Sequence, residues 1–338
     1  MNDQRGRDAT SPAAMPLKGW KEVAARTWQE ASSDAIGLVA AGVAFYAFLA
    51  IVPLLGAVVL TYGLLADPAT VIDHMASLTT TLPEDIAKLI GDQLVGVVAT
   101  SGESKGLGLL VALAVALFGA RNAAGGLIEA LNIAYEEKES RSFLGVNLLA
   151  LIMTAGAVAA FVFALLAVGA AGFLGKLVPT SHPAVVLALK ILTYVLLGLG
   201  GAVAAAMLYR FGPSRTNARW SWLTPGSVLF AVAWIVLTLG FGYYVARFGN
   251  YGATYGSLSA VVVLLTWIYL SAYALLFGAE LNSELEHQTA VDTTVSAAQP
   301  LGERGAWVAD HVADGPDDAG EARDDAGATP SLGNPPAG

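Results

Sequence analysis

The sequence predicts an all-α, polytopic membrane protein with six transmembrane helices and additional amphipathic helices at the membrane surface. Of its 338 residues, 55% are hydrophobic and only 13% are charged, whereas a soluble domain carries about 25% charged residues. Six segments are apolar over about 20 residues, the length that a helix needs to cross a hydrocarbon core of about 30 Å. These segments lack the alternating polar and apolar residues of a barrel strand, so we expect helices.

The composition divides the chain into three parts. Residues 1–17 show no apolar periodicity, and we expect them to be disordered and to contain no cleavable signal peptide. Residues 18–287 form the predicted membrane domain. Residues 288–338 hold nine acidic and two basic side chains among Gly, Pro and Ala. This composition is typical of disorder, because it buries too little apolar surface to offset the entropy lost on ordering.

The membrane domain begins with a predicted amphipathic helix. Trp20, Val23, Trp28 and Ala31 recur near helical spacing, with lysine and arginine between them. We expect this helix to lie at the membrane surface, with its tryptophans at the level of the lipid headgroups and its cations near anionic lipid.

Six spans follow, and two of them have unusual features. Pro53 interrupts the first span, where we predict a kink. The second span meets Arg121 before it continues towards Tyr135. The loop of residues 67–106 is too long for bare coil, and Thr81 and Glu84 have the spacing of a capping box. This loop either packs onto the bundle or forms a lid over a cavity. The predicted spans are residues 35–66, 108–135, 143–174, 184–209, 224–246 and 257–280.

The placement of lysine and arginine predicts the orientation. Outside residues 288–338, eleven of these cations fall on one side of the predicted spans or at its rim, and five fall on the other. The side rich in Lys and Arg is cytoplasmic by the positive-inside rule. Because the number of spans is even, we expect both termini in the cytoplasm.

Polar groups at membrane depth give the candidate site. Ionisable residues inside spans are costly and are functional candidates for that reason. Arg121 is followed by Asn122, while Glu129 and Asn132 lie further along the same predicted helix and Glu280 ends the last span. One interpretation is an ion pair that pins helices together, between Arg121 and Glu280, Glu129 or Asp34. The other is that Arg121 binds an anionic headgroup or substrate in a cavity.

The composition excludes several kinds of chemistry. The chain has no cysteine, and its four histidines lie far apart in the sequence. Thiolate chemistry and cysteine-based metal sites are excluded, and no histidine metal motif is present. There is no Walker motif, which excludes a P-loop ATPase. We therefore expect no catalytic residue, no metal site and no cofactor. The net charge of −9 argues against a nucleic-acid partner, so membrane lipids are the expected partners.

Several motifs occur in order along the membrane domain, and together they resemble a known family. They are AGVAFYAFLAIVPLL in the first span, RNAAGGLIEALNIAYEEKESRSF in and after the second, RFGPSR before the fifth and WIYLSAYALLFGAELNSELE in the sixth. Between Trp20 and His287 the chain resembles the YihY/BrkB family of bacterial inner-membrane proteins. The resemblance implies six helical spans and cytoplasmic termini. Family members have carried a virulence label or a ribonuclease label, ribonuclease BN.

The sequence leaves two functions open. Two-metal hydrolysis needs clustered carboxylates or histidines, and RNA binding needs a basic surface. Because the acidic residues are dispersed along the sequence, we expect no nuclease and no other enzyme. The favoured function is a transporter or a permease for a lipid or other amphiphile, with an anionic substrate held by Arg121. The alternative is a scaffold that maintains the cell envelope and moves nothing. Either could act as one chain or as a homo-oligomer.

Overall fold

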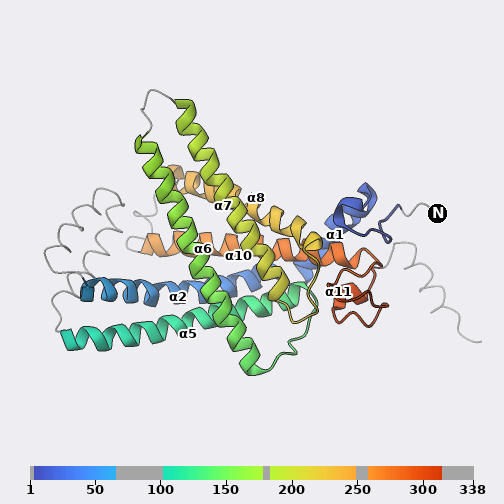
Figure 1. Cartoon of the computed structure of the whole chain (residues 1–338), viewed down its shortest axis with the longest axis horizontal. Coiled ribbons are helices and arrows are strands. Elements are labelled where there is room, and N and C mark those ends of the chain that lie inside the picture. Colours follow the sequence, from blue (N-terminus) through green and yellow to red (C-terminus); the bar gives the residue numbers. More distant parts are fainter. Residues whose placement is uncertain (1–3, 66–101, 178–182, 249–257, 314–338) are drawn as a thin grey trace, which may run out of the picture.

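The computed structural model describes residues 4–65, 102–177, 183–248 and 258–313, and the regular elements within these ranges are helices (Figure 1). Their bounds are η1 Pro12–Ala14, α1 Leu17–Ser33, α2 Ile36–Leu65, α5 Gly102–Ala134, α6 Phe143–Leu177, α7 Pro183–Phe211, α8 Trp220–Phe248, α10 Ser259–His287 and α11 Trp307–Asp310. The all-α fold class is confirmed. The loop of residues 67–106 lies almost wholly outside the described residues, and so does the capping box within it.

The long helices α2, α5, α6, α7, α8 and α10 coincide with the six predicted spans. Within the described residues, Leu187–Phe211, Trp220–Val245 and Val261–His287 are long and apolar enough to cross a membrane. A fourth span is counted if α1 and the first half of α2, which meet at a bend of 62°, are taken as one broken segment. A total of six crossings therefore stays a prediction. Helix α2 is continuous through Pro53, and the kink predicted there also stays a prediction.

Helices α2, α5 and α10 form one group, α6, α7 and α8 form a second, and the two groups pack against each other. Helix α2 packs along α5 and α10, and α10 also packs against α8. Helix α7 lies against α6 and α8. In Figure 1, α2, α5 and α10 run along the long axis of the molecule, whereas α6 and α7 cross it steeply. Apolar side chains of α8 that recur at every third or fourth position are exposed, namely Val228, Val232, Val236 and Leu239. An exposed apolar stripe of this length is expected to face lipid rather than water.

Helices α8 and α10 approach each other closely because two glycines face one another. A Cβ atom on Gly226 would lie 2.0 Å from the carbonyl oxygen of Gly278. Next to this contact, the Asn282 side chain accepts a hydrogen bond from the Gly226 N–H at 2.7 Å and donates one to the Leu223 carbonyl at 3.1 Å. Pro225 lacks an N–H and disturbs the backbone bonding of this turn. The α10 side chain therefore satisfies backbone groups of α8.

The buried core lies at one end of the molecule, where α1, α2, α5, α7 and α10 meet. Ile36, Leu131, Tyr135, Tyr209 and Leu276 are fully buried there. Helix α1 contributes an apolar face that packs against α10, which confirms its predicted amphipathic character. We refer to this end, with the loops and terminal segments that cover it, as the polar end.

The predicted disorder at the two termini is wrong for the residues that the structure describes. Of residues 1–17, residues 4–16 pack onto the polar end, where Ala9 and Met15 are buried against Trp222 and Leu285. Of residues 288–338, residues 288–313 are also packed, and the Ala290 N–H donates to the Arg7 carbonyl at 2.8 Å. Composition favoured disorder because the two segments hold few apolar residues. Those few dock onto a core that the membrane domain already provides.

Candidate functional site

The five predicted site residues do not form one site. Arg121 and Asn122 lie together in α5, Asn132 holds two loops at the polar end, and Glu280 lies against α1 and α2. Glu129 is exposed on α5 and has no part in these clusters. The structure thus separates the predicted set into a basic site within α5 and an acidic site at the polar end.

Arg121 hydrogen-bonds to two neutral amides. Its Nε donates to Asn147 Oδ1 at 2.7 Å, and its Nη1 donates to Asn122 Oδ1 at 2.9 Å. Asn147 lies in the first turns of α6, where its own amide nitrogen donates to the Phe143 carbonyl at 2.7 Å and so orients Oδ1 towards Arg121. Sequence reasoning missed Asn147, although it is one of only two polar residues, with Thr154, in the predicted span 143–174. In the described part of the chain, no carboxylate forms an ion pair with Arg121. The interpretation as an ion pair is therefore wrong.

Asn132 has a structural role at the polar end. It is buried and accepts a hydrogen bond from the Ser214 N–H at 2.7 Å, while its amide donates to Glu139 at 3.1 Å. It thereby joins the loop after α5 to the loop after α7. Hydrogen bonds from Arg141 lower the pKa of Glu139 to about 2. A cleft of about 480 Å³ lies beside these loops, and its lining includes Arg141 and Thr216.

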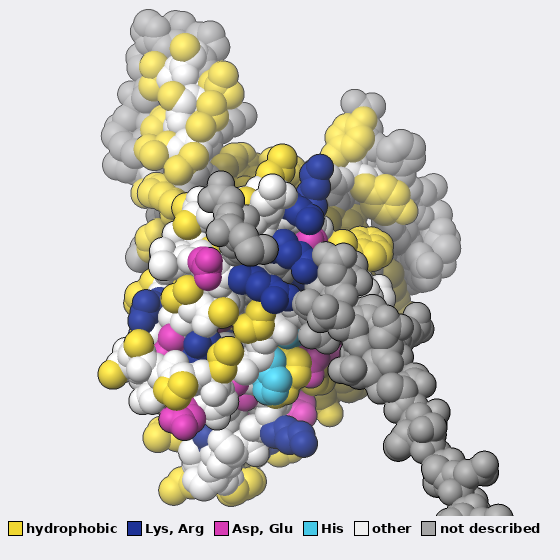
Figure 2. All heavy atoms as spheres, turned by 90° about the vertical axis from the view of Figure 1, so that its right-hand side faces the viewer, with side chains coloured by type: hydrophobic (Ala, Val, Ile, Leu, Met, Phe, Trp, Pro, Cys, Tyr) yellow, Lys and Arg dark blue, Asp and Glu magenta, His cyan; other side chains and the backbone are white. Residues whose placement is uncertain are grey.

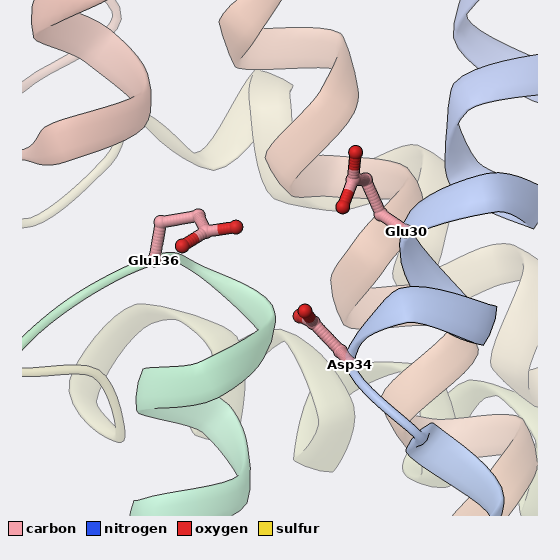
Figure 3. A group of neighbouring side chains, drawn as sticks. All are labelled: Glu30, Asp34 and Glu136. Atoms are coloured by element: carbon pink, nitrogen blue, oxygen red, sulfur yellow. The ribbon is translucent and has the colours of Figure 1, made fainter.

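Three carboxylates converge where α1 ends and α5 ends (Figure 3). Glu30 is in the last turn of α1, Asp34 caps that helix, and Glu136 follows α5. One carboxylate oxygen from each lies within 4.8 Å of the other two. Glu136 and Ala35, which follows Asp34, have φ angles of 55° and 51°. Non-glycine residues rarely adopt this left-handed conformation, which ends the regular helical backbone at both points.

Burial and repulsion favour the neutral form of two of these carboxyls. Burial, together with the nearby charges of Glu136 and Glu30, raises the pKa of Asp34 to about 6. Burial likewise raises the pKa of Glu136, and Glu30 adds to this effect. The raised pKa values reflect carboxyl groups that lie close together, and no ion pair of the described residues involves any of the three.

Glu280 is the fourth carboxylate at this junction. Its side chain extends from α10 towards Asp34 and is only 2% exposed. Its Oε1 is fully buried and has no hydrogen-bond partner among the described residues. The sequence predicted Glu280 as a site residue beside Arg121, whereas the structure places it beside Asp34.

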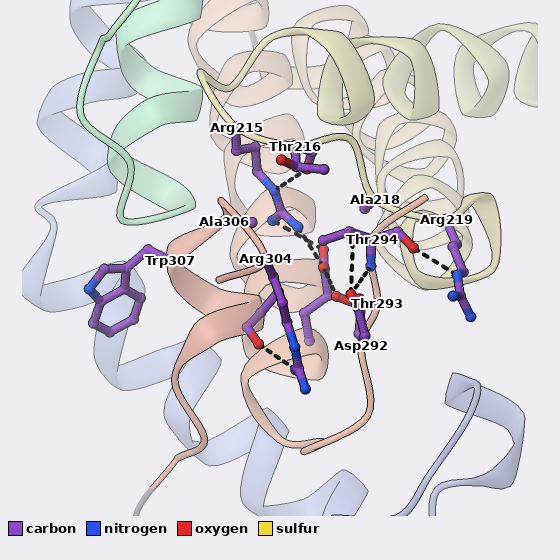
Figure 4. Close-up of polar contacts among 12 residues, drawn as sticks. Arg215, Thr216, Ala218, Arg219, Asp292, Thr293, Thr294, Arg304, Ala306 and Trp307 are labelled. Atoms are coloured by element: carbon purple, nitrogen blue, oxygen red, sulfur yellow. Dashed lines mark hydrogen bonds and ion pairs between the residues drawn. The ribbon is translucent and has the colours of Figure 1, made fainter. Parts of the chain in front are cut away.

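A separate buried network holds residues 288–313 against the membrane domain (Figure 4). Arg215 and Glu286 form an ion pair with an N–O distance of 2.7 Å, in which both side chains are almost fully buried. Thr293 donates to the same carboxylate at 2.6 Å. Arg304 donates to three backbone carbonyls at 2.6 to 3.1 Å. Figure 2 views this end and shows basic and acidic side chains gathered on it.

Comparisons with known proteins place this architecture in a family. The chain is 32% identical to the ribonuclease-like protein YfkH of Bacillus subtilis over 173 residues, which cover 50% of this chain and 62% of that protein. It is 39% identical over 97 residues to a UPF0761 membrane protein of Tolumonas auensis, which covers 29% of this chain and 30% of that one. A UPF0761 membrane protein of Ralstonia nicotianae is 38% identical over 106 residues, or 31% of this chain and 21% of that one.

These matches therefore span less than two thirds of the relatives' own lengths. No solved structure matches the chain. The sequence model of the family described as Virulence factor BrkB matches residues 27–301, which is most of the chain and includes every residue of both clusters. The matching relatives include several membrane proteins, in agreement with the long apolar helices. The chain therefore belongs to the BrkB family of integral membrane proteins.

Proposed function

We propose that this protein is a transporter or permease for an anionic amphiphile, and that Arg121 binds the anionic group. The observation that carries this proposal is the set of partners around Arg121. A guanidinium is charged at every physiological pH. Its hydrogen-bond partners in the described structure are the amide oxygens of Asn122 and Asn147. Amides orient the cation without neutralising it, and a partly buried charge of this kind attracts an anion.

The geometry leaves Arg121 able to bind a ligand. A guanidinium has five N–H donors, and two of them meet acceptors in the described part of the chain. The remaining donors suit a carboxylate or phosphate, which arginine binds through two parallel hydrogen bonds. Exposed apolar side chains flank the position on both helices, namely Phe118 on α5 and Leu144 and Leu148 on α6. An amphiphile could therefore place its headgroup at Arg121 and its hydrocarbon chain along this surface.

The proposal is tested by flux in liposomes that contain the purified protein. We expect the parent to move a fluorescent anionic lipid or detergent-like anion, and we expect Arg121→Ala to lose this activity. Arg121→Lys keeps the charge but loses the planar fork, so partial activity is expected. Arg141→Ala is the matched control, because that arginine pairs with Glu139 at the polar end. Full activity of both Arg121 variants would contradict the proposal. A parent without flux would favour the scaffold function.

We also propose that the protein is not an enzyme, although one relative is named as ribonuclease-like. The acidic cluster brings together carboxylates that are dispersed in the sequence, but a nuclease also needs basic groups that hold phosphates. The neighbouring Arg26 is already bound to Glu284 and Gln288. Incubation of the purified protein with RNA is expected to leave the RNA intact.

The proposed location is the bacterial inner membrane, with six spans and both termini in the cytoplasm. The excess of Lys and Arg on one side of the spans supports this orientation. Reporter fusions at the two ends are expected to report the same cytoplasmic side. Fusions that report opposite sides would show an odd number of crossings.

A further inference from the structure

We propose that Glu30, Asp34 and Glu136 form a binding site for one divalent cation of the Ca²⁺, Mg²⁺ or Mn²⁺ type, with Glu280 beside the site. The site lies at the junction of α1, α2, α5 and α10 (Figure 3). It is distinct from the Arg121 site and does not depend on the transport function. No local pattern in the sequence indicates this site, because its residues and the adjacent Glu280 come from three segments that lie far apart in the chain.

The distances within the cluster fit a single ion. Oxygens of Glu30, Asp34 and Glu136 lie within 4.8 Å of one another. Ligand oxygens contact Ca²⁺ at about 2.3–2.6 Å and Mg²⁺ at about 2.0–2.1 Å, so oxygens on opposite sides of such an ion are about 4–5 Å apart. The three carboxylates can therefore reach one cation with little movement. In its absence, three negative groups at this separation repel each other.

Glu280 provides a second and independent observation. It is 2% exposed, and its Oε1 has no hydrogen-bond partner among the described residues. A buried carboxylate oxygen without a partner carries a desolvation cost that native proteins rarely leave uncompensated. The Glu280 side chain hydrogen-bonds to Asp34, which places this carboxyl group at the same junction. A cation bound by the other three carboxylates would lie next to it and offset the cost.

The charges that face the junction leave it with an excess of negative charge. Arg26 is the nearby cation, but it bonds to Glu284 at 2.5 Å and to Gln288 at 2.5 Å. His287 also lies 3.7 Å from Glu284. Among the described residues, these two side chains therefore pair with Glu284, and no ion pair involves Glu30, Asp34, Glu136 or the adjacent Glu280.

The chemistry of the ligands selects the kind of ion. All three are carboxylates, and hard oxygen ligands favour Ca²⁺, Mg²⁺ and Mn²⁺ over ions that prefer nitrogen or sulfur. Because the ligands come from α1, its junction with α2 and the residues that follow α5, a bound ion would link these elements. Binding is therefore expected to stabilise the folded protein.

The test measures cation binding to the full chain in detergent after treatment with a chelator. Calorimetric titration with Mn²⁺ is expected to show saturable binding of about one ion per chain, and thermal unfolding is expected to shift upwards with Mn²⁺ or Ca²⁺. Glu136→Gln removes an exposed ligand and is not expected to impair folding. It should weaken Mn²⁺ binding at least tenfold, as even the loss of a group that supports a ligand does so. Asp34→Asn provides a second variant.

Glu129→Gln is the matched control, because Glu129 is an exposed glutamate of α5 outside the cluster. Its affinity for Mn²⁺ should equal that of the parent. The proposal is overturned if the parent binds no Mn²⁺, or if Glu136→Gln and Glu129→Gln bind it equally well. It is also overturned if acidification stabilises the parent while no divalent cation does so, because a shared proton then neutralises the cluster. None of these measurements uses flux, so failure here is distinguishable from failure of the transport proposal.

Discussion

The buried ion pair between Arg215 and Glu286 allows a quantitative prediction. The two side chains are 2% and 0% exposed, and the guanidinium contacts both carboxylate oxygens at 2.7 and 3.3 Å. Replacing Glu286 by Gln leaves the buried Arg215 charge without its ion-pair partner. Removing one partner of such a pair costs about 3–5 kcal/mol of folding free energy. Replacing both residues, as in Arg215→Met with Glu286→Gln, should cost clearly less than the sum of the single changes.

The measurement is the free energy of unfolding in detergent by chemical denaturation, for the parent, both single variants and the double variant. The pair formed by Arg141 and Glu139 is the matched control, because its N–O distance is 2.6 Å but each side chain is 24% exposed. Glu139→Gln should cost less than about 1 kcal/mol at neutral pH, because solvent screens exposed pairs. Equal costs for Glu286→Gln and Glu139→Gln would refute the reasoning, since burial would then have no effect.

Three further predictions concern the polar end and the contact between helices. Gly226→Ala places a Cβ atom 2.0 Å from a backbone oxygen of α10 and should lower the free energy of unfolding by about 1–3 kcal/mol. The control is Gly240→Ala, whose Cβ atom has no neighbour within 4 Å. It should not lower the stability measured by chemical denaturation. The Arg141 hydrogen bonds lower the pKa of Glu139 from 4.5 to about 2. The stability that this carboxylate adds is therefore complete above pH 4.5 and is lost as the pH falls towards 2, so the parent and Glu139→Gln should converge in stability at low pH. Deletion of residues 288–338 should lower the yield of folded protein in size-exclusion profiles, whereas a chain that ends after residue 313 keeps every described contact.

The sequence predicted the helices well because apolar composition reports directly on burial in lipid. The predicted span 184–209 compares with Pro183–Phe211 in α7, and 143–174 compares with Phe143–Leu177 in α6. The largest error concerns the end of α10, which was predicted at Glu280 but lies at His287. Polarity suggested an earlier end, yet the helix continues because its last turns bury their carboxylates against arginines.

The candidate sites were predicted less well, because they depend on tertiary contacts between distant segments. Arg121 was found because a charge inside an apolar run is conspicuous in the sequence. Its partner Asn147 lies in another helix, and no local pattern connects the two. The acidic cluster depends on the backbone at Ala35 and Glu136, where the helices end and the φ angles are positive. Neither residue is a glycine, so the usual signal for such a turn is missing.

Both proposed sites involve α5. We expect binding at one site to affect the other only by changing the position of this helix. Arg121 and Glu136 are 15 positions apart, which corresponds to about 20 Å at a rise of about 1.5 Å per residue. Through water at physiological salt, charges are screened over about 8 Å. A cation at the acidic cluster is therefore expected to influence an anion at Arg121 mainly by fixing the position of the α5 end. Because Glu136→Gln leaves Arg121 and its two amides in place, a change in flux in that variant would indicate movement of α5 rather than direct attraction between the two ions.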